Sequence, residues 1–400
     1  MKRIAIKNIC EVYDGPHATP KKTETGPVYL GIDAITEDGM LDSSQFSYLS
    51  KEDYIKWTKR VVPQENDIVF SYEATLGKYA LIPRGFYGCL GRRIAIIRVI
   101  SEEIDAKWLY YYFRSPEWNA FIKNQTVKGS TVDRISVEEF PNYTIPVISL
   151  KNQKKMVAVL EKIDAKIRTN NKINDYLEEM AKTIYDYWFV QFDFPDDNGK
   201  PYKSSGGALL YNEILKKEIP FGWTIDTLGN LLSKVPNSTK IPATDFYDKG
   251  SIPVIDQSSD FIAGYTDNET SLLYNKTGYI VFGDHTRVVK YIRFPFARGA
   301  DGTQVINSNN RCMPNELFYQ VIKSIDLSNY GYARHFKYLK ETIIAIPSAK
   351  LANIYAEKVG KWYENQVSIM KENNALSQLR DWLLPMLMNG QATIEERNAK

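Results

Sequence analysis

One stretch of this chain, residues 150–189, contains neither proline nor glycine and carries an apolar repeat with steps of three and four. The repeating positions are Leu160, Ile163, Ile167, Asn170, Asn174, Leu177, Ala181 and Ile184. This period predicts an amphipathic α-helix with a coiled-coil seam that two asparagines interrupt. At about 1.5 Å per residue the helix would be roughly 60 Å long. A seam of that length requires a second helix to cover it.

A second long helix is predicted over residues 350–388. Its seam follows the same step at Tyr355, Val359, Trp362, Gln366, Ile369, Asn373, Leu376 and Leu383. Pro385 and Gly390 indicate where this helix ends. Each predicted helix follows a strand-like run that closes in a proline, Pro146 or Pro347. The sequence therefore predicts a globular part followed by a helix, twice over.

The two globular parts share short sequence matches in the same order. These matches pair residues 225–228 with 6–9, 255–256 with 32–33, 280–282 with 68–70, and 333–335 with 132–134. Their conserved order indicates two copies of one α/β (α+β) domain whose loops have diverged. Aromatic residues at helical spacing over 107–121 predict one core helix in the first copy.

The sequence thus divides into six parts. They are a first globular domain (1–149), a central helix (150–190), a linker (191–218), a second globular domain (219–349), a C-terminal helix (350–388) and a tail (389–400).

Composition narrows the setting without fixing the function. The formal net charge is +3, because 51 basic residues nearly balance 48 acidic ones, so any nucleic-acid surface must come from local clustering. The three cysteines form no disulfide framework and no zinc pattern, which fits a reducing cytoplasm. The start of the chain lacks the apolar region of a signal peptide, and no apolar run is long enough for a membrane span. We expect a cytoplasmic protein.

No catalytic or metal site is predicted. The chain has no phosphate-binding GxxxxGK[ST] loop, no amino-methyltransferase motif and no HExxH spacing among its three histidines. The run GDHTR at 283–287 contains an adjacent aspartate and histidine, and a polar turn after a strand is the favoured interpretation there. We expect no enzymatic activity and no bound cofactor.

Basic residues interleaved with aromatic ones occur in loops of both globular parts. Lysine and arginine contact phosphates, while arginine and glutamine also read base edges. For any single one of them, solvated surface charge is the favoured interpretation, whereas the set in a two-copy architecture favours DNA binding. The predicted DNA-binding residues are Lys78, Arg92, Arg93, Lys128, Arg134, Arg287, Lys290, Arg298, Gln304, Arg334 and Lys337.

Over nearly its whole length the chain resembles the DNA specificity (S) subunits of type I restriction–modification systems. The features that carry the resemblance are Ile145-Pro146 before QKKMV at 153–157, LEKID at 160–164, IPFGW at 219–223, LRDWLLP at 379–385 and NG at 389–390. One departure is PSAKL at 347–351, which lacks the usual glutamine-rich start of the second helix.

The resemblance implies two target-recognition domains placed about a pseudo-twofold axis by helices that pack as an antiparallel coiled coil. Each domain would read one half of a bipartite DNA target, and the divergent loops predict unrelated halves. Two methyltransferase (M) subunits would carry S-adenosylmethionine and methylate adenine N6. Two restriction (R) subunits, where present, would use ATP and Mg²⁺ for host defence.

Two other functions stay open from the residues alone. A self-sufficient DNA-modifying enzyme would act on DNA without partners. A coiled-coil scaffold would bind only proteins, and its basic loops would be incidental. A salt-dependent affinity for DNA counts against the scaffold, because release of counterions from DNA makes binding sensitive to salt.

Overall fold

The computed structural model describes residues 2–127, 133–300, 302–308, 310–331, 334–388 and 391. They divide into two compact units: unit 1 comprises Met1–Ile167 and Asn374–Lys400, and unit 2 comprises Arg168–Asn373. Each long helix is therefore shared between the units, whereas the sequence-based division treats it as a separate part. None of the described helices combines the length and apolar character that crossing a lipid bilayer requires.

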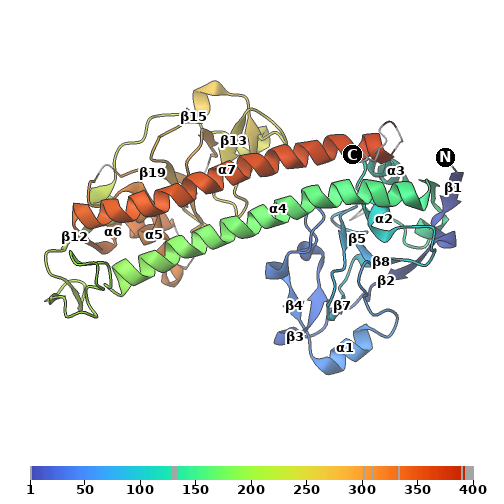
Figure 1. Cartoon of the computed structure of the whole chain (residues 1–400), viewed down its shortest axis with the longest axis horizontal. Coiled ribbons are helices and arrows are strands. Elements are labelled where there is room, and N and C mark those ends of the chain that lie inside the picture. The colour runs from blue at the N-terminus through green and yellow to red at the C-terminus, as the bar shows by residue number, and fades with distance from the viewer. Residues whose placement is uncertain are drawn as a thin grey trace, which may run out of the picture. The chain divides into compact units, whose positions relative to one another are not determined.

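Unit 1 is built on two small sheets (Figure 1). The antiparallel sheet β2-β8-β5-β6 consists of Cys10–Asp14, Ile94–Val99, Ile68–Ser71 and Tyr79–Leu81. The sheet β4-β3-β7 consists of Ser47–Tyr48, Thr23–Leu30 and Gly88–Leu90, and its β3–β7 pair is parallel. A separate antiparallel pair joins β1 (Lys2–Ala5) to β9 (Thr144–Val147), and α1 spans Lys51–Trp57.

Aromatic side chains dominate the core of unit 1. Many come from α2 and α3, which span Ala106–Phe113 and Pro116–Gln125. Trp108 and Trp118 are almost completely buried. The prediction of a single helix over 107–121 was wrong, because Ser115 caps the start of α3 and Pro116 follows it. Proline is tolerated in the first turn of a helix but breaks a helix interior.

Unit 2 repeats this plan. The sheet β14-β13-β18-β15 consists of Gly264–Thr266, Ile252–Ile255, Phe296–Arg298 and Leu272–Leu273, with β13 and β18 parallel. The antiparallel sheet β17-β16-β19 consists of Val289–Ile292, Tyr279–Gly283 and Thr303–Ile306. β12 (Thr224–Thr227) pairs with β20 (Ile343–Ile346), and helices α5 and α6 span Asn315–Ser324 and His335–Glu341.

Matched backbone hydrogen bonds establish which residues of the two units are equivalent. Ile6 and Leu228 are both fully buried. Each donates its N–H at 2.9 Å to the carbonyl of the residue that precedes the partner strand, Tyr143 before β9 and Thr342 before β20. Ile6 is therefore equivalent to Leu228, and its sequence match with Ile225 was displaced by three residues. The match of 280–282 with 68–70 is confirmed, because both segments form interior strands. A short apolar match is easily assigned to the wrong register where isoleucine or leucine recurs every three residues.

The two long helices are α4 (Leu150–Tyr185) and α7 (Ala349–Met388). Within unit 1, Met156 and Leu160 of α4 share a core with Leu384 and Leu387 of α7. As residue numbers rise along α4 they fall along the facing part of α7, so the segments pack antiparallel. A π-helical turn, Asp186–Val190, follows α4.

The antiparallel seam continues in unit 2 with polar contacts. Asn170 Nδ2 donates to Asn373 Oδ1 at 2.8 Å, and Asn373 Nδ2 donates to Asn171 Oδ1 at 2.8 Å. Gln366 Nε2 donates to the Asn174 carbonyl at 3.0 Å. These amides give the seam a defined register, because only one alignment satisfies them all.

The predicted seam residues differ in burial. Leu160, Ile163, Asn170 and Val359 are buried, whereas Ile167, Asn174, Leu177, Ile184, Trp362, Ile369, Asn373 and Leu376 are half-buried. Residues that the sequence analysis did not assign fill much of the seam, among them Asp164, Tyr363 and Arg380.

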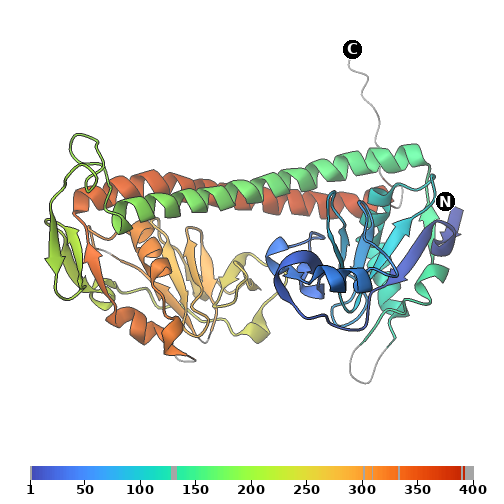
Figure 2. The ribbon, with the colours of Figure 1, turned by 90° about the horizontal axis from the view of Figure 1, so that it is seen from below.

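Residues 191–218, predicted as a linker, contain ordered structure that belongs to unit 2. A hairpin forms from β10 (Leu209–Asn212) and β11 (Lys217–Pro220), and Figure 2 shows it beyond the last turns of α4. Phe194 stacks on Tyr202 with ring centroids 4.6 Å apart and on Trp223 at 5.8 Å. Stacked aromatic rings exclude water, so a segment rich in turn residues still acquires a fixed conformation.

Candidate nucleic-acid interface

The loops of unit 1 converge at one edge of its sheets. The end of β5 lies beside the start of β8 because these strands are antiparallel, and β3 and β7 end together because they are parallel. Tyr72 N–H donates to the Arg93 carbonyl at 3.0 Å, and Ile135 N–H donates to the Tyr72 carbonyl at 2.8 Å. We call residues 31–46, 72–78, 91–93 and 133–135 the loop edge of unit 1.

Four of the predicted basic residues lie at this loop edge. Lys78 Nζ is 2.9 Å from Glu37 Oε1, and Arg93 Nε is 3.1 Å from Glu73 Oε1. Arg92 and Arg134 are exposed. The fifth, Lys128, lies outside the described residues. The structure thus brings together basic side chains that are up to 56 positions apart in the chain, from Lys78 to Arg134.

Arg93 adopts an unfavourable backbone conformation at this edge. Its φ is +67°, in the left-handed region that most side chains avoid. Gly302 of unit 2 is its equivalent, because both carbonyls accept the same backbone hydrogen bond, and its φ is +75°. Unit 1 thus retains an arginine where the backbone favours glycine. Such strain often marks a functional position.

Unit 2 has an equivalent loop edge, made of residues 256–263, 284–288, 299–300, 302–303 and 334–335. Asp284 N–H donates to the Gly302 carbonyl at 2.7 Å, and His335 N–H donates to the Asp284 carbonyl at 2.8 Å. These bonds repeat those of Tyr72 and Ile135. The Leu30 carbonyl accepts from Gly91 N–H after β7, and the Ile255 carbonyl accepts from Gly299 N–H after β18. Ile255 is therefore equivalent to Leu30, whereas the sequence match had paired it with Ile32, two positions further on.

The predicted residues of unit 2 differ in how accessible they are. Arg287, Arg334 and Lys337 are exposed, and Gln304 is half-buried on β19 opposite Phe282. Arg298, at the end of β18, is half-buried, and burial lowers the pKa of its guanidinium. Within the described part of the chain its Nε atom is buried without a hydrogen-bond partner. A buried donor of this kind is available to an incoming acceptor.

Lys290, predicted to contact DNA, is buried in the structure. Its side chain is only 4% exposed, and Nζ donates to the Asp256 carbonyl at 3.0 Å and to the Asp260 carbonyl. Burial lowers the pKa of Lys290. The alternation of side chains along β17 turns it inward, so Lys290 holds the loop that follows β13 instead of presenting its charge at the surface.

The aspartate of the 283–287 run also has a structural role. Asp284 is buried, and its Oδ1 accepts from Phe336 N–H at 2.8 Å at the start of α6. Its carbonyl lies 2.9 Å from His335 Nδ1. Asp284 therefore joins two loops of the edge, as the polar-turn interpretation favoured. Among the described residues, no group of three or more histidine, cysteine or acidic side chains is arranged to hold a metal ion.

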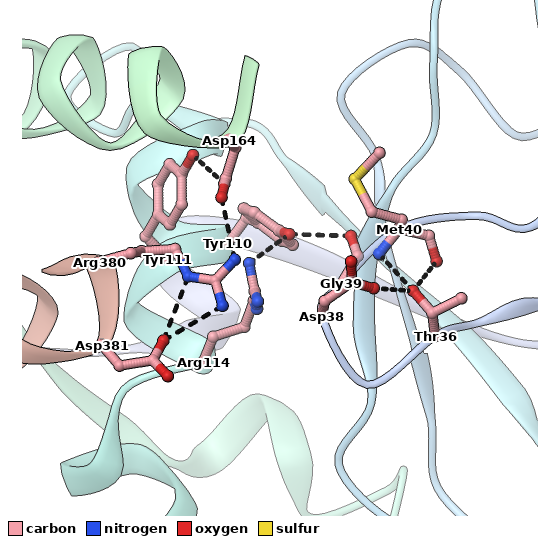
Figure 3. A network of polar contacts seen from close by, with 10 residues as sticks. All are labelled: Thr36, Asp38, Gly39, Met40, Tyr110, Tyr111, Arg114, Asp164, Arg380 and Asp381. Atoms are coloured by element: carbon pink, nitrogen blue, oxygen red, sulfur yellow. Dashed lines mark hydrogen bonds and ion pairs between the residues drawn. The ribbon is translucent and has the colours of Figure 1, made fainter. Parts of the chain in front are cut away.

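In unit 1 a buried polar network fixes the globular part on the helices (Figure 3). Asp164 Oδ2 accepts from Tyr111 OH at 2.7 Å, and Asp164 Oδ1 accepts from Arg380 Nη1 at 3.0 Å. The carboxylate and the guanidinium are each about one tenth exposed. Burial raises the pKa of Tyr111, so its hydroxyl remains a donor.

In unit 2 the globular part is also attached to the helix segments, through side chains that differ from those of unit 1. Gln320 Nε2 donates to Tyr363 OH at 2.8 Å, and Tyr319 OH donates to Glu178 Oε1 at 2.8 Å. Arg293 Nη1 donates to the Gly360 carbonyl at 2.8 Å. These bonds attach α5 and the residue that follows β17 to α4 and α7. In each unit, hydrogen bonds thus attach the globular part that carries the loop edge to the helix segments of that same unit.

One pattern shared by α2 and α5 was missed in the sequence. Arg114 lies over the ring of Tyr110, with Cζ 5.1 Å from the centroid, and Lys323 lies over the ring of Tyr319, with Nζ at 5.4 Å. Both are tyrosine–cation pairs four residues apart on one helix face. A search for this spacing would have found the repeat in these helices.

Comparisons with known proteins agree on one family. A model of the type I restriction modification DNA specificity domain matches residues 1–179. The chain is similar to the MjaIX specificity subunit of Methanocaldococcus jannaschii, with 25% identity over 98% of this chain and 93% of that protein. It is also similar to the HindI specificity subunit of Haemophilus influenzae, with 21% identity over 66% and 72%.

A solved structure resembles the fold as a whole. It is the S subunit of a type I restriction–modification system from M. genitalium, with a TM-score of 0.52 and 15% identity, covering 99% of this chain and 96% of that one.

Proposed function

This chain belongs to the DNA specificity subunits of type I restriction–modification systems, and we propose that each of its units reads one half of a bipartite DNA target through its loop edge. The observation that carries this proposal is the repeated edge itself. Equivalent backbone bonds hold Tyr72 and Asp284 at the same place in the two sheets, with exposed arginines around each. Arginine at such edges contacts phosphates and base edges.

The two halves of the target differ in sequence. Equivalent positions of the two loop edges carry different side chains: Gly302 of unit 2 is equivalent to Arg93 of unit 1, and Val288 is equivalent to Lys78. Two surfaces that place different donors and acceptors on DNA prefer different bases. An asymmetric target follows, with two unrelated half-sites.

Partner subunits perform the chemistry. Two methyltransferase subunits bring S-adenosylmethionine and methylate adenine N6 at the position that this chain selects, and restriction subunits bring ATP and Mg²⁺ where a cell has them. The chain itself binds no cofactor and catalyses no step. Its place is the prokaryotic cytoplasm, where the DNA lies. The similarity to specificity subunits and the lack of catalytic motifs in the sequence support this division.

Exchange of one globular part tests the proposal. Residues 219–349 are replaced by the corresponding part of another specificity subunit, and the methylated target is determined in complex with the methyltransferase subunit. The proposal expects one half-site to change while the other stays the same. A simultaneous change in both halves, in a complex shown to assemble, would mean that the units do not read DNA independently.

A further inference from the structure

Lys78 is not a simple surface cation. Its side chain is 19% exposed, and Nζ lies 2.9 Å from Oε1 of Glu37, whose side chain is 83% exposed. The lysine is therefore largely packed, whereas its acidic partner projects into solvent at the loop edge of unit 1. A phosphate would meet the carboxylate as well as the ammonium group, so the pair suits a ligand that has both a donor and an acceptor.

Glu37 stands on a turn with a fixed conformation. Thr36 Oγ1 accepts from Met40 N–H at 2.9 Å, and the backbone closes with Gly39 N–H donating to the Thr36 carbonyl at 3.1 Å. Thr36 Oγ1 also donates to Asp38 Oδ1. A turn whose backbone is already held before binding loses less conformational entropy on binding.

Tyr110 of α2 contacts this turn directly (Figure 3). Its hydroxyl donates to the Gly39 carbonyl at 2.8 Å in a buried hydrogen bond. Gly39 has a φ of +82°, and a Cβ atom there would lie 2.3 Å from the Tyr110 hydroxyl. Only glycine permits this close approach. The turn is thus fixed to the helix that also carries Tyr111, whose hydroxyl bonds to Asp164 of α4.

The sheet topology places the turn at the DNA-facing edge that we propose. It follows β3, which ends beside β7 where Arg92 and Arg93 begin the next loop. An ionised carboxylate accepts hydrogen bonds and donates none. In the major groove the exocyclic amino groups of cytosine and adenine are the donors, and carboxylates pair with the cytosine amino group. Lys78 offsets the repulsion between Glu37 and nearby phosphates.

We propose that Glu37, held beside Lys78, accepts a hydrogen bond from an exocyclic amino group of a base in the half-site read by unit 1. That donor is N4 of cytosine or N6 of adenine. Glu37 is then a specificity-determining residue, and Tyr110 is a positioning residue that acts through the turn. The inference rests on the proposed function and adds the chemical group that is read.

The test measures binding by the complex of this chain with its methyltransferase subunit. Duplexes carry the wild-type target or a single base-pair change at each position of the unit 1 half-site. Glu37→Ala should reduce discrimination at one position by roughly ten- to hundred-fold and leave the other positions unchanged. The wild-type preference there identifies the amino group as that of cytosine or of adenine.

Glu37→Gln separates the two sources further. Glutamine pairs with the N6 and N7 atoms of adenine, so it should shift a cytosine preference toward adenine and retain an adenine preference. Tyr110→Phe should weaken discrimination at the same position as Glu37→Ala, whereas a loss spread evenly over the half-site would overturn its positioning role. Glu65→Ala is the matched control, because Glu65 is exposed just before β5, at the strand end opposite the loop edge.

The two levels of the proposal fail differently. If the wild-type complex shows no split target, the proposed function is wrong before any variant is compared. If the target is split but Glu37→Ala discriminates like wild type at every position of that half-site, the role of Glu37 is wrong and the proposed function stands. A loss confined to the other half-site also overturns the role of Glu37.

Discussion

Arg380 Nη1 lies 3.0 Å from Asp164 Oδ1, and this ion pair joins α7 to α4 within unit 1 across 216 positions of sequence. Tyr111 OH completes the arrangement by donating to the other carboxylate oxygen at 2.7 Å. The pair therefore links both helices to the globular part. Removing one partner of a buried ion pair leaves an uncompensated charge, which is far more costly than losing a surface pair.

Arg380→Ala should lower the free energy of unfolding of unit 1 by about 3–5 kcal/mol. Urea denaturation of the full chain, followed by circular dichroism, measures the change. Lys182→Ala is the control, because it removes a surface pair with Asp186, four residues further along in the π-helical turn, and should cost about 0.5 kcal/mol or less. Equal effects of the two variants would show that the Asp164–Arg380 pair does not hold the helices.

Glu316→Gln should change the pH dependence of stability. Burial raises the pKa of Glu316 above its ordinary value of 4.5, against the weaker opposing effect of Arg293. The folded state therefore holds this proton more tightly than the unfolded state. The wild-type stability contribution falls as pH rises from below 4.5 through the folded pKa. The variant has no such dependence, so its stability relative to wild type should rise between pH 4 and pH 7.

Urea midpoints of both proteins at the two pH values measure this difference. If the stability of the variant relative to wild type falls as pH rises, the ionised Glu316 is stabilised by Arg293 more than it is penalised by burial.

Lys290→Met and Arg334→Ala should weaken DNA binding in different ways. Lys290 holds the loop after β13 through two carbonyls, so its loss should reduce discrimination in the unit 2 half-site with little change in salt dependence. Arg334 is exposed, and loss of one phosphate contact should reduce the slope of log affinity against log salt by about 1. Titrations at several salt concentrations separate the two. A reduced slope of log affinity against log salt in Lys290→Met would indicate that Lys290 contacts DNA directly.

Arg93→Gly should stabilise the fold and weaken DNA binding. Glycine adopts a φ of +67° without the steric cost of a side chain, which is about 1 kcal/mol. Arg92→Gly is the control: its φ is not positive, so glycine there should give no gain in stability, while DNA affinity should also fall. Thermal unfolding and binding titrations measure both properties. Unchanged DNA affinity in both variants would remove these arginines from the interface.

The helices were the most predictable part of the fold. Their seams follow from a three- and four-residue period, which depends on neighbouring residues alone. Pro385, which indicated the end of the second helix in the sequence, lies inside α7. The contacts that give the helices their register, such as Arg380 with Asp164, join residues far apart in the chain. A charged residue in a seam reads as a surface position until its partner is known, and both of these were therefore missed.

The sequence predicted the basic residues of the candidate interface as a set, and the structure shows how far each of them is exposed. Arg287 and Arg334 are exposed at the loop edge, whereas Lys290 points inward from β17. The difference depends on strand register, and a shift of one residue reverses which side chains face the core. The turn at 36–40 gave no sequence signal for DNA binding, because its acidic side chains suggest ordinary solvated charge. Its position beside Lys78 became clear only from the fold.

As a specificity subunit, this chain should determine a split DNA target. The most direct measurement is a map of methyladenine in plasmid DNA from cells that co-express the chain with its methyltransferase subunit, compared with cells that express the methyltransferase subunit alone. A chain with this role should produce a new motif of two unrelated half-sites separated by a spacer, present only with this chain. An assembled, active complex that yields no such motif would contradict the proposed function and would favour a scaffold without DNA readout.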